Sequence, residues 1–135
     1  MREIHRRTHS VSHFQVDLVA KGSPLSEPCM PATPVLFAPG HIKVATAWDD
    51  NGRSMPFVEI AITLDDGAAP DFTGLVALAE GPFEAADAGL ETGNFITGDT
   101  AALSLPRGLY RAVVLVDTLE AMSARRVHFH LLMQE

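Results

Sequence analysis

Two histidines near the end of the chain, in the tripeptide His128-Phe129-His130, have the clearest chemical potential. Alternate residues of a β-strand point to the same face, so the two imidazoles would lie on one face, about 6.6 Å apart. Such pairs chelate metal ions in β-barrels when a neighbouring strand supplies a third ligand. The candidate third ligands are His13, His41 and Glu59.

The competing interpretation places His128 and His130 at the surface, on the outer face of an edge strand. None of the candidate third ligands has a spacing that marks it as a ligand, and barrel metal sites usually show a richer grouping of His and Glu. We therefore predict no cofactor and no resident metal. His128, His130 and His13 remain the candidates for a metal-binding or small-ligand site.

Acidic residues form the second chemically distinctive group. The chain has a net charge of −7, and residues 44–106 contain eleven acids and one base, Arg53, which gives this segment a net charge of −10. Such a surface disfavours direct contact with a nucleic acid backbone and suits a basic protein partner. A plain solubilising surface is the alternative. Loops at the ends of sandwiches commonly carry binding sites, so the predicted contact residues are Asp49, Asp50, Asp65, Asp66 and Asp71.

Catalytic signatures are missing from the sequence. It contains no phosphate-binding loop, dinucleotide fingerprint, zinc-finger spacing or nucleophile elbow, and no nucleophile–base–orienter set can be assigned. The single cysteine, Cys29, cannot form a disulfide within the chain, and we interpret it as a thiol without a function in a reducing compartment. No apolar run is long enough to cross a bilayer and no secretory signal opens the chain, so we expect a cytoplasmic protein without membrane association.

The elements that must position these residues are strands. The stretch Ala101–Val116 contains two alternating runs around Pro106-Arg107-Gly108, which predicts a tight hairpin whose second strand is central in its sheet. Ile42–Trp48 and Pro56–Leu64 predict a second hairpin, closed by a turn that ends in Asn51-Gly52.

The remaining segments complete an all-β pattern. Residues 1–9 are polar and are predicted to be flexible, and the proline-rich stretch 22–40 is predicted to cover a sheet edge or to carry function. Further strands are predicted at residues 10–21, 75–79, 82–84, 90–97 and 124–133. The chain 1–135 is therefore predicted to be a single domain, an antiparallel β-sandwich of about seven or eight strands, with a closed β-barrel as the alternative.

The order of these elements resembles the competence protein J family. His13-Phe14-Gln15-Val16 opens a strand before a Ser-Pro-containing loop, and a strand–turn–strand unit ends in PFVEIAI. Gly-Pro-Phe, with a glycine several residues on (Gly81–Gly89), precedes the predicted hairpin Ala101–Val116. The most specific feature is Leu105–Arg111, LPRGLYR, which is similar to the family's Leu-Pro-Lys/Arg-Gly-x-Tyr turn. The resemblance implies a small bacterial cytoplasmic protein that inhibits a DNA-degrading nuclease.

The expected function is accordingly a non-enzymatic binding protein, an inhibitor or immunity-type partner of a basic protein such as a nuclease, acting through its acidic loops. The alternative is a metal-binding β-barrel enzyme or a small-ligand binder that uses His128 and His130. Both functions are compatible with a dimer.

Overall fold

The fold was analysed in a computed structural model, which describes residues 1–23, 34–47 and 56–134. These residues form ten strands and no helix, and therefore no helix that could cross a membrane. The strands are β1 (Arg2–Ser10), β2 (Gln15–Ala20), β3 (Val35–Ala38), β4 (His41–Ala45), β5 (Phe57–Leu64), β6 (Val76–Ala85), β7 (Leu90–Asn94), β8 (Asp99–Leu103), β9 (Gly108–Val116) and β10 (Arg126–Met133).

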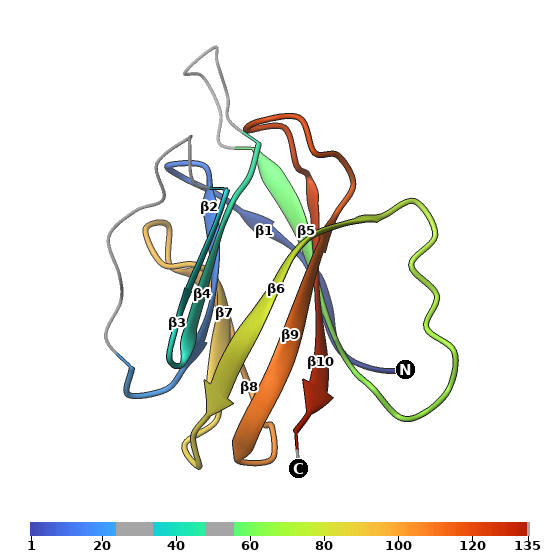
Figure 1. Cartoon of the computed structure of the whole chain (residues 1–135). Coiled ribbons are helices and arrows are strands. Elements are labelled where there is room, and N and C mark those ends of the chain that lie inside the picture. The colour runs from blue at the N-terminus through green and yellow to red at the C-terminus, as the bar shows by residue number, and fades with distance from the viewer. Residues whose placement is uncertain (24–33, 48–55, 135) are drawn as a thin grey trace.

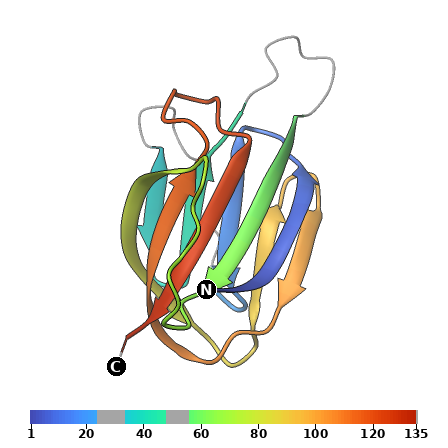
Figure 2. The ribbon, with the colours of Figure 1, turned by 90° about the vertical axis from the view of Figure 1, so that its right-hand side faces the viewer.

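The strands form two five-stranded sheets that face one another (Figures 1 and 2). Sheet A has the order β1-β5-β10-β9-β6, and sheet B has the order β3-β4-β2-β7-β8. Neighbouring strands are antiparallel except for β5 and β10, which run parallel. The predicted all-β sandwich is confirmed, with ten strands rather than seven or eight. The barrel alternative is wrong, because the two sheets remain separate.

One hydrophobic core fills the space between the sheets. The alternation of apolar residues in the sequence predicts eight core residues, and six of them are buried: Val16, Ile60, Ile62, Leu105, Val114 and Phe129. The other two, Phe14 and Leu103, are only partly buried. The edges of the two sheets also meet: β1 contacts β8 on one side, and β6 contacts β3 on the other. On the second side the ring of Phe37 lies directly against Gly81, where a Cβ would come within 2.8 Å of it.

Both predicted hairpins are wrong in their pairing. β8 pairs with β7 in sheet B, whereas β9 pairs with β10 and β6 in sheet A. The Pro106-Arg107-Gly108 turn therefore carries the chain from one sheet to the other, and the hydroxyl of Tyr110 donates to the carbonyl of Pro106 at 2.7 Å to fix it. Likewise β4 belongs to sheet B and β5 to sheet A, and the predicted Asn51-Gly52 turn lies outside the described residues. Alternation of apolar residues is the same for a hairpin and for such a crossing.

The start of the chain also differs from the prediction. Residues 2–10 form β1, which pairs with β5 from Arg2↔Leu64 to Ser10↔Phe57, instead of a flexible end. The sequence did not predict this strand, because its inward-facing positions carry the polar residues His5, Arg7 and His9 instead of apolar ones. In the proline-rich stretch, Val35–Ala38 form the edge strand β3, and residues 24–33 lie outside the described residues.

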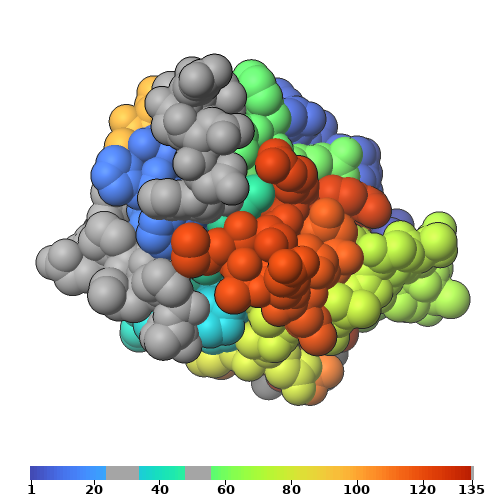
Figure 3. Space-filling view, turned by 90° about the horizontal axis from the view of Figure 1, so that it is seen from above, coloured from blue at the N-terminus to red at the C-terminus, as the bar shows by residue number. Residues whose placement is uncertain are grey.

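Connections at the ends of the strands shape the molecular surface. In the view of Figure 3 the connection between β9 and β10, in orange-red, lies in the middle of one end of the sandwich. The connection between β5 and β6, in yellow-green, projects to the side. This second connection, residues 65–75, is called the acidic loop below.

Candidate functional site

The predicted histidine pair lies on β10, between β5 and β9, and so in the middle of sheet A rather than at an edge. Both rings point away from the core toward Thr63 on β5. Thr63 Oγ1 lies 2.7 Å from Nε2 of His128 and 2.8 Å from Nδ1 of His130. A hydroxyl carries one proton, so it donates to one imidazole and accepts from the other when both rings are neutral.

Phe72 of the acidic loop covers this group. Its ring centroid lies 5.3 Å from that of His128 and 5.1 Å from that of His130, in edge-on geometry in both cases. Figure 2 shows the acidic loop crossing the outer face of sheet A in front of β10. We call Thr63, Phe72, His128 and His130 the histidine clasp.

Burial sets the protonation of the clasp. It lowers the pKa of His128 to about 4, helped by the nearby Arg6, His130 and Arg126. Burial also lowers the pKa of His130, against the carboxylates of Asp65 and Asp66. Both imidazoles are therefore neutral at neutral pH, as the shared Thr63 hydroxyl requires.

The proposed third metal ligands lie elsewhere. His13 is in the turn after β1, beyond the Ser10↔Phe57 pair, whereas Thr63 is at the other end of β5, opposite Glu3. His41 is in sheet B, and Glu59 forms ion pairs with Arg6 and Arg126. Within the described ranges, no group of three or more His, Cys, Asp or Glu residues is arranged to hold a metal ion.

The acidic loop holds three of the five predicted contact residues, and all three are exposed: Asp65, Asp66 and Asp71. Asp66 accepts hydrogen bonds from the amino group of Met1 at 2.6 Å and from the backbone N–H of Ala68 at 3.0 Å. Asp71 accepts from the N–H and the hydroxyl of Thr73. These bonds lower the pKa of both carboxyl groups, so both are ionised at neutral pH.

The other two predicted contact residues, Asp49 and Asp50, lie outside the described residues. The described neighbours of their segment are Ala47 and Pro56, and Pro56 stands at the start of β5. The acidic loop begins at the end of β5, about 23 Å further along for an eight-residue strand. That Asp49 and Asp50 share one surface with the aspartates of the acidic loop therefore stays a prediction.

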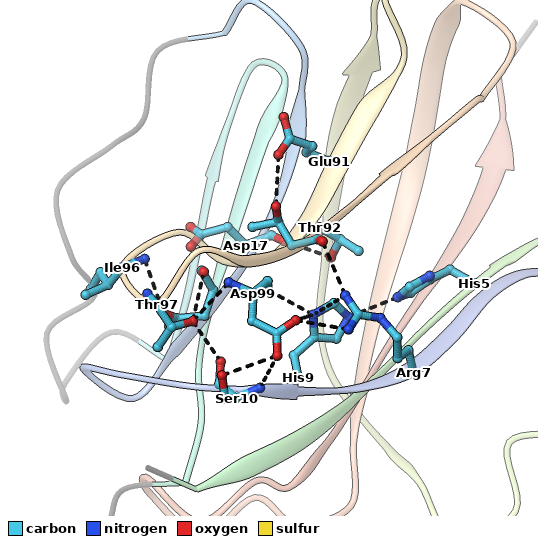
Figure 4. A network of polar contacts seen from close by, with 12 residues as sticks. His5, Arg7, His9, Ser10, Asp17, Glu91, Thr92, Ile96, Thr97 and Asp99 are labelled. Carbon is cyan, nitrogen blue, oxygen red and sulfur yellow. Dashed lines mark hydrogen bonds and ion pairs between the residues drawn. The ribbon is translucent and has the colours of Figure 1, made fainter.

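A second polar cluster, not predicted from the sequence, joins β1 to β8 (Figure 4). Nε2 of His5 lies 3.0 Å from Nε2 of His9. Nδ1 of the fully buried His9 lies 2.9 Å from the carbonyl oxygen of Asp99, and Arg7 forms an ion pair of 3.0 Å with the Asp99 carboxylate. The same carboxylate accepts from the N–H of Ser10 at 2.7 Å. We call this cluster the edge seam.

The edge seam connects β1 of sheet A to β8 of sheet B through side chains rather than through a backbone hydrogen-bond ladder. Gly93 on β7 makes room for it, since a Cβ there would come within 2.8 Å of Thr100 Cα and 3.0 Å of Nδ1 of His9. The hydrogen bond from Ser10 is the main cause that lowers the pKa of Asp99. The alternate spacing of His5, Arg7 and His9 was the available signal, because it places three polar side chains on one strand face.

Comparison with solved structures finds a match over the whole chain. It is the crystal structure of ComJ from Bacillus subtilis, an inhibitor of the DNA degrading activity of NucA. The TM-score is 0.64, and the alignment covers 98% of each chain at 14% sequence identity. The protein has the fold of ComJ.

This likeness concerns the complete two-sheet arrangement, because it covers 98% of both chains. It confirms the fold that the LPRGLYR resemblance implied. At 14% identity it assigns no role to a residue. No protein-family model and no curated protein sequence matches the chain.

Proposed function

We propose that this protein is a binding protein that inhibits a nuclease with a basic nucleic-acid groove. The observation that carries the proposal is the likeness to ComJ, which extends over both sheets and is matched in length. ComJ inhibits the DNA degrading activity of NucA, and a nuclease of this kind is the partner that we assign to the present chain.

The contact surface that we assign is the acidic loop. Its three aspartates are exposed, and the stretch 65–75 contains no basic residue. The pKa values of Asp66 and Asp71 are lowered, so these two carboxyl groups are ionised at neutral pH. A groove that binds phosphates is positively charged, so ionised carboxylates at its mouth accelerate association and compete with the substrate. Asp49 and Asp50 are proposed as a second part of this surface.

Anchoring of the acidic loop supports this assignment. Phe72 fixes the middle of the loop against His128 and His130, while Asp66 and Asp71 cap its turns. A loop that is ordered before binding loses less conformational entropy on association than a free loop. The clasp therefore has a role that needs no bound metal.

Inhibition of DNA degradation tests the proposal. Purified protein is titrated into NucA acting on double-stranded DNA, and the test variant is Asp65→Asn/Asp66→Asn/Asp71→Asn. We expect inhibition by the natural chain, and an inhibition constant raised at least about tenfold in the variant at low salt. The difference between the two proteins should shrink as salt is added, because salt screens exposed charges.

The matched control is Glu80→Gln/Glu84→Gln/Glu120→Gln, which removes the same charge from exposed positions outside the acidic loop. It should inhibit like the natural chain. Equal weakening of both triple variants would show that net charge, not the acidic loop, drives binding. Failure of the natural chain to bind NucA or any basic nuclease from its own cell would overturn the proposed function.

A further inference from the structure

The connection between β1 and β2 is a tight turn in an unfavourable backbone conformation. After Val11, which is fully buried, only residues 12–14 lead from sheet A to sheet B. His13 and Phe14 have φ values of 59° and 43°, so two consecutive L-residues lie in the left-handed region. That region is unfavourable for residues with a Cβ, most of all for bulky ones such as Phe14. The turn therefore stores strain that an extended conformation would release.

β1 is also the strand whose surroundings are easiest to reproduce in another copy. Among the described strands, β1 is connected covalently to the rest only through this turn, and it lies at an edge of sheet A. Its attachments include the ladder with β5, the edge seam with Asp99 and Thr100 of β8, and a hydrogen bond from the hydroxyl of Thr97 to the carbonyl of Ser10. Each of these would form unchanged with the same residues of a second molecule.

We propose that two copies of this chain exchange β1, so that residues 2–11 of each copy complete sheet A of the other. The partner is a second copy, because a second copy contains the same β5 and the same Asp99 of the edge seam, in the register in which β1 pairs with them. Extension of residues 12–14 releases the strain of both turns in the dimer, which is the condition under which strand exchange is favoured. The proposal is independent of the proposed function.

Hydrogen bonds to the closed turn oppose the exchange and limit it to high concentration. The buried amide of Asn94 donates to the carbonyls of Ser12 and Gln15, at 2.8 and 2.7 Å, and the N–H of Thr46 donates to the carbonyl of Phe14 at 2.9 Å. An extended connection gives up at least one of these bonds. We therefore expect the monomer in dilute solution and the exchanged dimer after refolding at about millimolar concentration, where a second β1 competes with the linked one.

A disulfide across the β1–β5 ladder distinguishes exchange from ordinary dimerisation. Thr8 and Glu59 are directly opposite each other on the outer face, and Cys29 is the only native cysteine. The variant Thr8→Cys/Glu59→Cys/Cys29→Ser is refolded at high concentration, and its dimer is isolated by size-exclusion chromatography. The isolated dimer is then diluted and oxidised. Exchange predicts a covalent dimer on denaturing gels without reductant, whereas a dimer of closed monomers gives a monomer band. Each single-cysteine variant controls for random cross-linking.

Two variants at one position test the role of strain. Phe14→Gly and Phe14→Ala both remove the ring, but only glycine adopts the left-handed conformation freely. The dimer dissociation constant should be about tenfold higher for the glycine variant than for the alanine variant. Equal constants would overturn the strain argument. Absence of a dimer under all conditions, or a dimer that yields only monomer bands, would overturn the exchange itself.

Discussion

Thr63 Oγ1 lies 2.7 Å from Nε2 of His128, across the only parallel strand pair among the described strands. His130, not His128, is the register partner of Thr63, so the hydroxyl reaches diagonally to one ring while it also contacts the other. This arrangement is satisfied when both imidazoles are neutral. A proton added to the ring that accepts from Thr63 turns its nitrogen into a second donor, which the oxygen can accept only by leaving its own hydrogen unpaired.

The stability of the protein should therefore depend on pH. Burial lowers the pKa of His128 to about 4, from 6.5 in the unfolded chain. Between these values the unfolded chain binds a proton that the folded protein excludes, so the free energy of unfolding falls as the pH is lowered through this window. The full shift corresponds to about 3 kcal/mol. Urea unfolding at several pH values measures it.

The variant His128→Asn isolates this contribution. It keeps a hydrogen-bonding side chain beside Thr63 but removes the titrating group, so the loss of stability between pH 6.5 and 4 should be smaller than in the natural chain. Comparison at about pH 8, well above the unfolded pKa of 6.5, gives the cost of the substitution itself, because the natural imidazole is neutral there in both states. An unchanged pH dependence would mean that His128 is not the titrating group.

Asn94 should be among the most sensitive polar residues. Its side chain donates to Ser12 and Gln15 and accepts from the N–H groups of Ile96 and Thr97, so all its hydrogen-bonding capacity is used. Asn94→Ala leaves these groups unpaired and should lower the free energy of unfolding by about 2–4 kcal/mol. Gln134→Ala, which removes an exposed amide, should change it by less than about 0.5 kcal/mol. Chemical denaturation compares the two variants.

Two glycines with positive φ should respond differently to alanine. Gly93 (φ 136°) lies against Thr100 and His9, whereas nothing lies within 4 Å of a Cβ at Gly98 (φ 79°). Gly98→Ala should cost about 1 kcal/mol of backbone strain. Gly93→Ala adds a clash inside the edge seam and should cost at least about 2 kcal/mol more. Equal thermal stability of the two variants would show that β7 and β8 can move apart without loss.

Removal of Phe72 should free the acidic loop without unfolding the sandwich. In Phe72→Ala the loop loses its contact with both imidazoles, so amide hydrogens of residues 67–74 should exchange at least about tenfold faster. Phe57→Ala, at the opposite end of β5 and 63% exposed, is the control and should leave this exchange unchanged. Hydrogen exchange read by mass spectrometry decides between them.

Much of the architecture could be predicted from alternation of apolar residues. The inward positions of β10, Val127, Phe129 and Leu131, are buried as their period-two spacing predicted. What alternation could not predict is the sheet to which the next strand belongs. Pro106-Arg107-Gly108 indicated a reversal of the chain, but only contacts between distant residues decide that β8 and β9 lie in different sheets.

The candidate site was predictable in its residue types more than in its arrangement. Exposure of Asp65, Asp66 and Asp71 follows from a polar loop, and their role as contacts remains a prediction. The outward direction of His128 and His130 was predicted, but their cover was not, since Phe72 lies in a segment without periodicity. The edge seam was not predicted, because polar residues at alternate positions of residues 2–10 are also typical of a solvent-exposed chain end.

The position of β10 has a consequence for how the protein is made. β10 lies between β5 and β9, yet it follows both in the chain, and its contact with β5 joins residues 67 positions apart. Until residues 126–133 are free to pair, nothing joins β1 and β5 to β9 and β6, and both pairs keep an unpaired edge of the kind that chaperones shield and that otherwise aggregates. Loss of β10 would split the sheet in its middle rather than shorten it at an edge.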